Sequence, residues 1–310
     1  MVNKDLFRLR QLSRRKHIKN SASHKAFSII NYILLGVLAF TMIYPMFYIV
    51  ILSFNEGNDA LKGGIWLWPR EFTLDNYIQV FANSQLVGAF VVSIIRTVVG
   101  TVVSVFFIAL MAYALARKEL PGRKFFNKFF FFTTIFAAGL IPTICLFRDL
   151  DLLDNPLVYI LPAVFSFYNM LIIRTSFEGV PVGLREAAQM EGVSEFKIFW
   201  KIYLPLAKPA LATVALFTAV FHWNDWFAGS YYISSDWLKP AATILQEMLE
   251  EALGSLNNNA TNSGTGGDVT VTAQTLQMAF VVVITFPIMV VYPFLQKHFT
   301  KGALVGSIKE

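Results

Sequence analysis

Long apolar stretches alternate with shorter polar connections along almost the whole chain. Six of these stretches have, or nearly have, the roughly twenty apolar residues that cross the hydrocarbon core of a bilayer. They cover residues 27–51, 86–116, 129–147, 157–173, 206–228 and 276–295. This pattern predicts an all-α integral membrane protein with six transmembrane helices, and the even number places both termini on one side of the membrane.

Prolines within the apolar stretches are expected to bend the helices, because a proline lacks the N–H that the helix interior needs. These residues are Pro45, Pro142, Pro162 and Pro287. The fourth stretch, 157–173, is the shortest and has the least defined ends.

The composition agrees with a membrane protein, since 55% of the 310 residues are hydrophobic and 15% are charged. The single cysteine, Cys145, excludes an intramolecular disulfide and a cysteine-based metal site. The four histidines are scattered singly, so their spacing indicates neither a metal site nor a catalytic pair.

The distribution of Lys and Arg predicts the orientation. Eight lie in residues 1–26, five in 117–128, five in 174–208 and three in 297–310, whereas the opposite connections contain four. The positive-inside rule therefore predicts cytoplasmic termini. The net charge of +6 reflects this topology, and a nucleic-acid partner is not expected.

The remaining segments complete the predicted domain organisation. Residues 1–26 form a basic cytoplasmic arm, 27–296 a transmembrane domain, and 297–310 a cytoplasmic tail. The extracellular segment 229–275 contains the Asn- and Gly-rich run 257–267, which predicts a flexible loop. Trp66 and Trp68, in the other long extracellular connection, suit the headgroup region of the membrane.

One cytoplasmic connection, 181–205, has a helix–turn–helix pattern. Pro181 suits the start of a helix, Gly192 suits a chain reversal, and Ser194 precedes a second amphipathic run that Pro205 ends or bends. Within it, the spacing is Glu-Ala-Ala, three residues, Gly, nine residues, Ile, one residue, Leu-Pro. The matching residues are Glu186, Ala187, Ala188, Gly192, Ile202, Leu204 and Pro205.

This spacing resembles the EAA loop of binding-protein-dependent ABC importer permeases. An amphipathic hairpin that lies on the membrane is the alternative, but it would not explain the full set of spacings. The order of the apolar stretches, the run 221–226 and the tail 292–303 resemble the carbohydrate branch, especially maltose-type and oligosaccharide-type permeases that form the second member of a heterodimer.

The resemblance implies a type I importer permease fold with an EAA coupling-helix hairpin. It also implies the partners: a homologous second permease, two ATP-binding subunits, an extracellular sugar-binding protein with a lipid anchor, and an oligosaccharide substrate. The chain contains no Gly-x-x-x-x-Gly-Lys-Ser/Thr phosphate loop, so we expect no enzymatic activity or cofactor in this chain, with ATP and magnesium bound by the partner ATPases.

In such an importer, the hairpin would enter a cleft on the ATPase and act as a lever. Glu186 would meet a basic group, Ala187 and Ala188 would allow close approach, and Gly192 would hold the turn.

Polar residues inside the predicted spans are candidates for the sugar path, because polar groups are costly in lipid and tend to face a cavity or another helix. The candidates are Arg96, Tyr168, Asn169, His222, Asn224 and Asp225. The alternative for each is a bond between neighbouring helices. Arg96 is expected to pair with Asp225 or a carbonyl group, or to meet an acidic sugar such as a uronate.

Three other functions compete with a sugar importer. An ion-coupled secondary transporter would place a carboxylate near mid-membrane, but the first four predicted spans and the sixth contain no Asp or Glu. A membrane enzyme would need a set of catalytic groups, for which Asp149, Asp151 and Asp154 come nearest. An importer for amino acids, polyamines or ions would share the EAA loop, and only the resemblance favours sugar.

Overall fold

The computed structural model describes residues 22–258 and 271–307, which are helices joined by turns. The basic arm before residue 22, most of the Asn- and Gly-rich run and the end of the tail lie outside the described residues. Within the described part, strand-like pairing is limited to an isolated bridge between Asn55 and Phe72. The chain divides into two units, residues 1–49 and 50–310.

Among the described residues, three helices are long and apolar enough to cross a membrane, and they coincide with the helices expected at 27–51, 86–116 and 276–295. They are α2 (Ala22–Ser53), α5 (Ser84–Ala116) and α15 (Ala273–Ser307). The apolar side chains of α2 are largely exposed, as expected for a helix that faces lipid. Pro45 lies inside α2 and Pro287 inside α15.

Two of the expected spans contain or begin with a sharp bend. In the region 129–147, α6 (Arg123–Ile135) and α7 (Leu140–Asp149) meet at an angle of 115°. Gly139, with φ of +87°, precedes α7, and Pro142 lies in the first turn of α7, where its missing N–H costs little. The fifth span begins with a bend of 84° before α12 (Lys208–Asn224).

The fourth span, expected as a helix over 157–173, is not continuous. A 3₁₀ turn at Pro156–Tyr159 is followed by turns around Pro162, and α8 (Phe167–Glu178) begins only afterwards. Twelve helical residues extend about 18 Å, short of the roughly 30 Å hydrocarbon core. The described helices therefore provide three spans, or up to five if each bent pair counts as one, and the six-span count is not confirmed.

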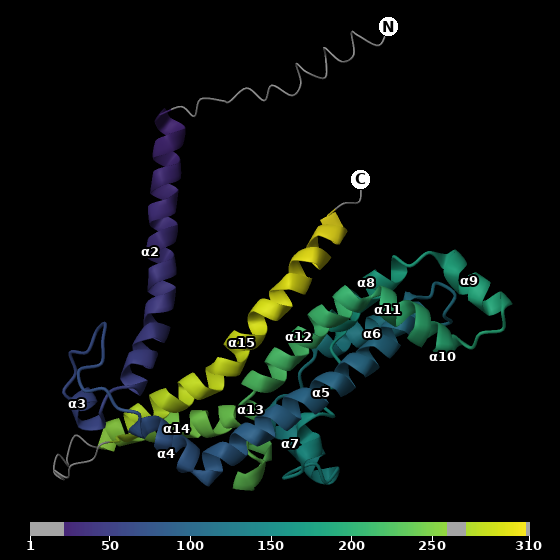
Figure 1. Cartoon of the computed structure of the whole chain (residues 1–310). Helices are drawn as coiled ribbons and strands as arrows, with labels where there is room; N and C mark the ends of the chain where they lie inside the picture. Colours follow the sequence, from purple (N-terminus) through teal and green to yellow (C-terminus); the bar gives the residue numbers. More distant parts are fainter. Residues whose placement is uncertain (1–21, 259–270, 308–310) are drawn as a thin grey trace. The chain divides into compact units, whose positions relative to one another are not determined.

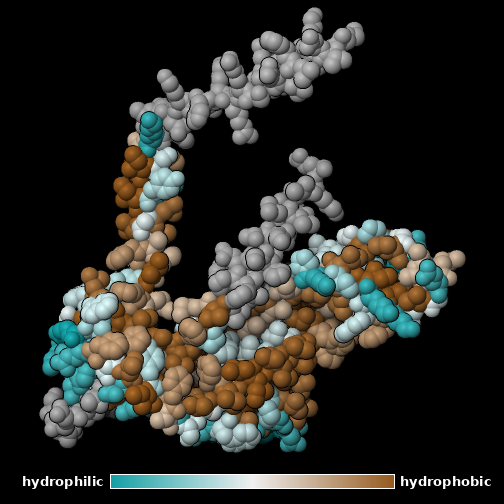
Figure 2. Space-filling model, in the orientation of Figure 1, coloured by the Kyte–Doolittle hydropathy of each residue, from teal (hydrophilic) through white to brown (hydrophobic). Residues whose placement is uncertain are grey.

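The second unit is organised around α5, which packs against α8, α12 and α14 (Figure 1). α15 in turn packs against α4 (Asp75–Ala82), α12 and α14 (Ala241–Asn258). Apolar residues cover most of the visible face of the central helices, and hydrophilic residues gather around α9 (Val182–Met190) and α10 (Glu195–Ile198) (Figure 2). This distribution fits a membrane-embedded body with polar ends.

The segment 229–275, expected to be a flexible loop, is helical over much of its described length. It contains the end of α13 (Phe227–Tyr232), a 3₁₀ turn at Asp236–Leu238, and the whole of α14. Ile244, Leu245 and Met248 of α14 belong to an apolar cluster with α5 and α15. Their three- and four-residue spacing is a helical signal that the sequence reasoning overlooked.

The acidic connection between α7 and α8 (149–156) holds two loops together. The Oδ1 atom of Asp154 accepts hydrogen bonds from the backbone N–H groups of Ser234 (3.0 Å) and Ser235 (2.8 Å), and Oδ2 accepts one from the Ser235 hydroxyl (2.6 Å). The hydroxyl and these N–H groups lower the pKa of Asp154. Asp154 therefore has a structural role, because both of its carboxylate oxygens are bound by the loop at residues 234–235.

Candidate coupling site and transport path

The connection 181–205 forms a helical hairpin at one end of the second unit (Figure 1). α9 (Val182–Met190) begins directly after Pro181, and α10 (Glu195–Ile198) begins directly after Ser194. Between them, Gly192 has a φ of +71°, a left-handed conformation that glycine adopts without steric cost. The Gly192 turn is therefore present where the sequence predicted it.

The second arm of the hairpin continues through a π-helical turn at Phe199–Tyr203 into α11 (Leu204–Leu206). Ile202 and Leu204 pack against an apolar cluster that includes Tyr113 and Phe177. Pro205 lies in α11, and the bend into α12 follows two residues later at Ala207. These residues thus fix the second arm to the helical body, a role that the spacing alone did not reveal.

The first arm offers an open surface. Glu186 and Ala187 are exposed, and no residue of α9 is buried. Ala188 is half-buried and contacts the same apolar cluster as the second arm. Met190, at the end of α9, is 89% exposed, so a large apolar side chain stands in solvent next to the motif.

A carboxylate that the sequence reasoning did not single out joins the hairpin to the body. Glu195 accepts hydrogen bonds from Tyr113 (2.6 Å), Arg185 (3.0 Å) and Gln189 (2.8 Å), and it also forms an ion pair with Arg117. Burial raises its pKa, but the bonds from Tyr113 and Arg185 and the charge of Arg117 outweigh this and hold the pKa of Glu195 below its usual value. The carboxylate is thus charged at neutral pH.

Arg96 and Asp225 pair across the helices α5 and α12, as one of the sequence-based alternatives expected. The guanidinium donates to the backbone carbonyl of Asp225 (2.8 Å) and to its carboxylate. It also lies 4.3 Å from the centroid of the Tyr159 ring. Because Arg96 is only 4% exposed, its charge lies inside the protein, where the Asp225 carboxylate neutralises it.

His222 lies one turn before Asp225 on α12 and is fully buried against Gly100 of α5. Neither ring nitrogen has a hydrogen-bond partner among the described residues. A Cβ atom on Gly100 would lie 2.5 Å from Nε2 of His222. The His222 ring therefore occupies the space that a side chain at position 100 would need. Arg96, His222 and Asp225 therefore form one cluster between the two helices.

The other path candidates lie elsewhere. Tyr168 is exposed and Asn169 is half-buried on α8, and none of the described contacts joins them to the Arg96 cluster. Asn224 is exposed, and its amide donates to the carbonyl of Val220 on the same helix (3.0 Å). For Asn224, the alternative to a sugar contact was a hydrogen bond to a neighbouring helix. The structure shows a hydrogen bond within α12 instead.

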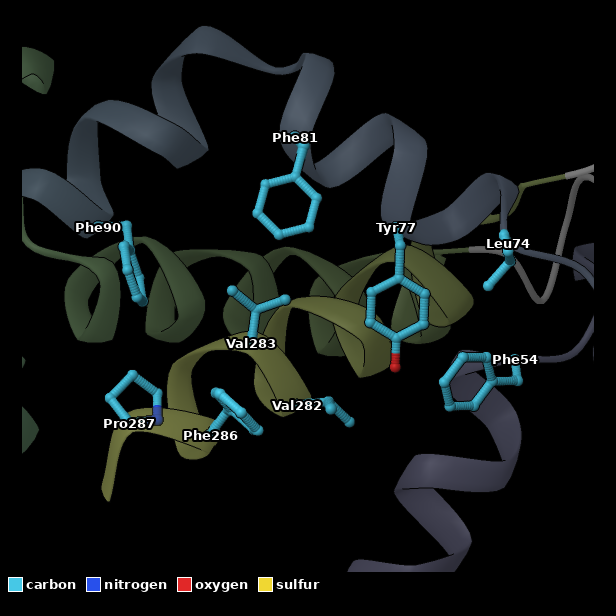
Figure 3. A pocket seen from close by; sticks show the side chains of 9 residues that line it. All are labelled: Phe54, Leu74, Tyr77, Phe81, Phe90, Val282, Val283, Phe286 and Pro287. Atoms are coloured by element: carbon cyan, nitrogen blue, oxygen red, sulfur yellow. The ribbon is translucent and has the colours of Figure 1, made fainter. Parts of the chain in front are cut away.

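A pocket of about 430 Å³ opens between α4, α5 and α15, and it contains none of these candidates (Figure 3). The lining side chains are aromatic or aliphatic: Phe54, Leu74, Tyr77, Phe81, Phe90, Val282, Val283, Phe286 and Pro287. The Tyr77 hydroxyl is hydrogen-bonded to Ser53 (2.7 Å). Sugars need several polar partners for their hydroxyl groups, so this pocket does not have the chemistry of a sugar site.

Among the residues that the structure describes, no three His, Cys, Asp or Glu side chains gather as a metal site would require. Among the polar residues considered as functional candidates, the structure thus brings several together in two places, the hairpin with Glu195 and the Arg96 cluster. A body of long apolar helices with an exposed polar hairpin fits the class of membrane transport proteins.

Comparisons with known proteins agree with this class. The chain is 38% identical over 290 residues to the protein LplC of Bacillus subtilis, covering 94% of this chain and 97% of LplC. It is 35% identical over 286 residues to the polygalacturonan/rhamnogalacturonan transport system permease protein YtcP of the same species, covering 92% and 99%.

A solved structure gives the same result. A chain in the crystal structure of a bacterial ABC transporter involved in the import of the acidic polysaccharide alginate superimposes with a TM-score of 0.80 and 33% identity, covering 90% of this chain and 98% of that one. A chain from the alginate transporter in complex with a pentasaccharide-bound periplasmic protein has a TM-score of 0.55 and 13% identity, which shows a shared fold alone.

The chain belongs to the family of binding-protein-dependent transport system inner membrane components, which matches residues 21–304. It is accordingly a membrane permease subunit of an ABC importer, and in such systems ATP hydrolysis belongs to partner ATPases. The expectation of an importer permease is thereby confirmed. The match includes the tail 292–303, whose side chains are not described.

Proposed function

We propose that this chain is a permease subunit of an ABC importer for oligosaccharides, and that its substrates are acidic oligosaccharides built of uronic acids. The similarity to the alginate importer chain over 90% of the sequence carries this proposal. The relative named for polygalacturonan transport supports the same substrate class, since polygalacturonan is also a polymer of uronic acid. A solute-binding protein outside the cell delivers the oligosaccharide.

The orientation of the proposed importer follows from charge. The hairpin lies within the connection 174–208, which contains five Lys and Arg, and by the positive-inside rule this connection and both termini face the cytoplasm. There α9 meets one of two ATPase subunits, with Glu186 and Ala187 exposed for contact. A homologous second permease completes the pathway. Closure of the ATPase pair moves the hairpin and switches the pathway between its two openings.

The selection of acidic substrates does not rest on Arg96 in this geometry. Its guanidinium is buried and neutralised by Asp225, and a uronate would have to displace that carboxylate. Two of the other candidates, Tyr168 and Asn224, have exposed polar side chains and are better placed than Arg96 to contact a sugar. Aromatic faces suit sugar rings, and amide groups suit hydroxyl groups.

The substrate class is tested by ATP hydrolysis in lipid nanodiscs that contain this chain with the second permease and the ATPases encoded beside it. The matching binding protein is added empty, with neutral oligosaccharides, or with oligosaccharides of galacturonate, guluronate or mannuronate. We expect stimulation by the uronate oligosaccharides. Stimulation by neutral oligosaccharides alone would overturn the acidic assignment, and an assembled complex that responds only to a non-sugar solute would overturn the sugar assignment.

A further inference from the structure

α9, the arm that carries Glu186 and Ala187, has little packing of its own. It contains no buried residue, and its contacts with the body come through Ala188 and the adjoining turn. Among the described residues, the side-chain hydrogen bonds that leave α9 come from Arg185 and Gln189. The position of α9 therefore depends on what these two side chains bind.

Both side chains bind the same oxygen of Glu195. Oε1 accepts from the Arg185 guanidinium (3.0 Å) and from the Gln189 amide (2.8 Å). Arg185 also reaches Glu119 (3.2 Å), but that carboxylate side chain is 70% exposed, so solvent screens the pair. Glu195 is thus the better-shielded anchor for α9.

The second oxygen of Glu195 faces the end of α5. Oε2 accepts from the Tyr113 hydroxyl (2.6 Å) and from the guanidinium of Arg117, the residue that caps α5. Each carboxylate oxygen therefore has two donors, and the two sets of donors come from different helices. One side chain joins α9 to α5 through charge-assisted hydrogen bonds.

The α5 side of this junction is firmly packed. The Tyr113 ring lies 5.2 Å from the ring centroid of Phe199 and 4.8 Å from that of Tyr203, both in the π-helical turn. Phe199 is buried with Phe177 of α8 in the same cluster. The second arm is therefore fixed to the body by apolar packing, whereas the first arm is fixed mainly by polar bonds that converge on Glu195.

We propose that Glu195 is a positioning residue for coupling, which makes α9 move together with α5 when the ATPase displaces the hairpin. The proposal rests on the proposed function in one respect, that α9 is the arm that meets the ATPase. When the carboxylate is lost, α9 turns about Gly192 without moving α5. Less oligosaccharide is then transported for each ATP that is hydrolysed.

The test compares Glu195→Gln with Glu178→Gln in the assembled complex. Glu178 is a matched control because its side chain is 40% exposed, against 41% for Glu195, and it also binds two arginines, Arg123 (2.7 Å) and Arg174 (2.9 Å). It connects the ends of α6 and α8 and makes no described bond to α9. Assembly is checked by the amount of ATPase subunit that copurifies.

Two measurements are made on each variant. Hydrogen exchange of the peptide over 182–191 reports how often α9 opens, and uptake of oligosaccharide per ATP hydrolysed reports coupling. For Glu195→Gln we expect exchange in α9 to be faster and uptake per ATP to be lower, each by about tenfold, the effect of losing roughly one hydrogen bond to a charged group. Glu178→Gln should match the wild type in both.

The outcomes separate this inference from the proposed function. The role of Glu195 is overturned if Glu195→Gln leaves hydrogen exchange in α9 unchanged, or if exchange is faster but uptake per ATP stays at the wild-type value. It is also overturned if Glu195→Gln and Glu178→Gln reduce uptake per ATP equally. A wild-type complex that no oligosaccharide stimulates overturns the proposed function, while exchange in α9 still decides whether Glu195 holds it. If Glu195→Gln does not assemble, the double variant Arg185→Met with Gln189→Met removes both α9 donors to Glu195, and wild-type behaviour of that variant overturns the inference.

Discussion

Single residues determine how closely the helices of the body approach one another. Gly100 of α5 lies directly against the buried ring of His222 on α12, and Arg96, one turn earlier, pairs with Asp225. Gly100, which has no side chain, and Arg96, whose charge is neutralised, thus lie one turn apart on the face of α5 that contacts α12. Both features can be tested by substitution.

Gly100→Ala should destabilise the protein, because its Cβ would lie 2.5 Å from Nε2 of His222 and force the helices apart. Overpacking of this kind costs about 1–3 kcal/mol. Gly88→Ala is the control on the same helix, since a Cβ there meets nothing within 4 Å and alanine favours the helix. Thermal unfolding of the purified complex should show a lower midpoint for Gly100→Ala alone. Equal midpoints would contradict the contact.

Replacing Arg96 by methionine should destabilise the protein by about 3–5 kcal/mol, because it leaves the Asp225 carboxylate without its partner. The double variant Arg96→Met with Asp225→Leu should recover much of this loss. Thermal unfolding measures the stability, and uptake of acidic and neutral oligosaccharides measures function. A stable double variant that loses only acidic substrates would show instead that Arg96 recognises the uronate.

At the scale of secondary-structure elements, the hairpin is the part of the protein that the proposed mechanism moves. Its second arm is packed on α5 and α8, and its first arm is exposed beyond the Gly192 turn. In the proposed mechanism, force applied to α9 passes to the spans through this turn, through Glu195 and through the contact of Ala188 with the body. The geometry of the turn should matter more than its chemistry.

Gly192→Pro should abolish stimulated ATP hydrolysis in a complex that still assembles. Proline fixes φ near −65°, whereas Gly192 has a φ of +71° and donates its N–H to the Gln189 carbonyl (2.9 Å). Gly192→Asn is the control, because asparagine tolerates the left-handed conformation and the site has open space around it. Normal stimulation of ATP hydrolysis in an assembled Gly192→Pro complex would contradict the lever mechanism.

The elements also show how far the sequence could predict the structure. The helices at α2, α5 and α15 followed from apolar length, and the hairpin turn followed from glycine and proline positions. The break at 160–166 did not, because an apolar run of spanning length has the same composition whether it is one helix or a turn and a short helix. The role of Glu195 was missed because two of its four donors, Tyr113 and Arg117, lie about eighty residues away in the chain.

For the whole molecule, family membership and the described geometry support the same account. The described residues form an apolar helical body with a buried charge pair and an exposed hairpin, and the family to which the chain belongs works with partner ATPases. The sugar class came from resemblance at the sequence level, and the alginate and polygalacturonan relatives narrow the proposal to acidic oligosaccharides. Physical reading of the residues alone does not choose the substrate.

Uptake of a labelled uronate oligosaccharide into proteoliposomes that hold the complete complex tests this account most directly. ATP is enclosed with the ATPase subunits facing inward, and the binding protein is supplied outside. We predict accumulation that requires ATP, the binding protein and an intact Gly192 turn. Accumulation without ATP or driven by an ion gradient, or accumulation of a non-sugar solute in place of the uronate, would contradict the account.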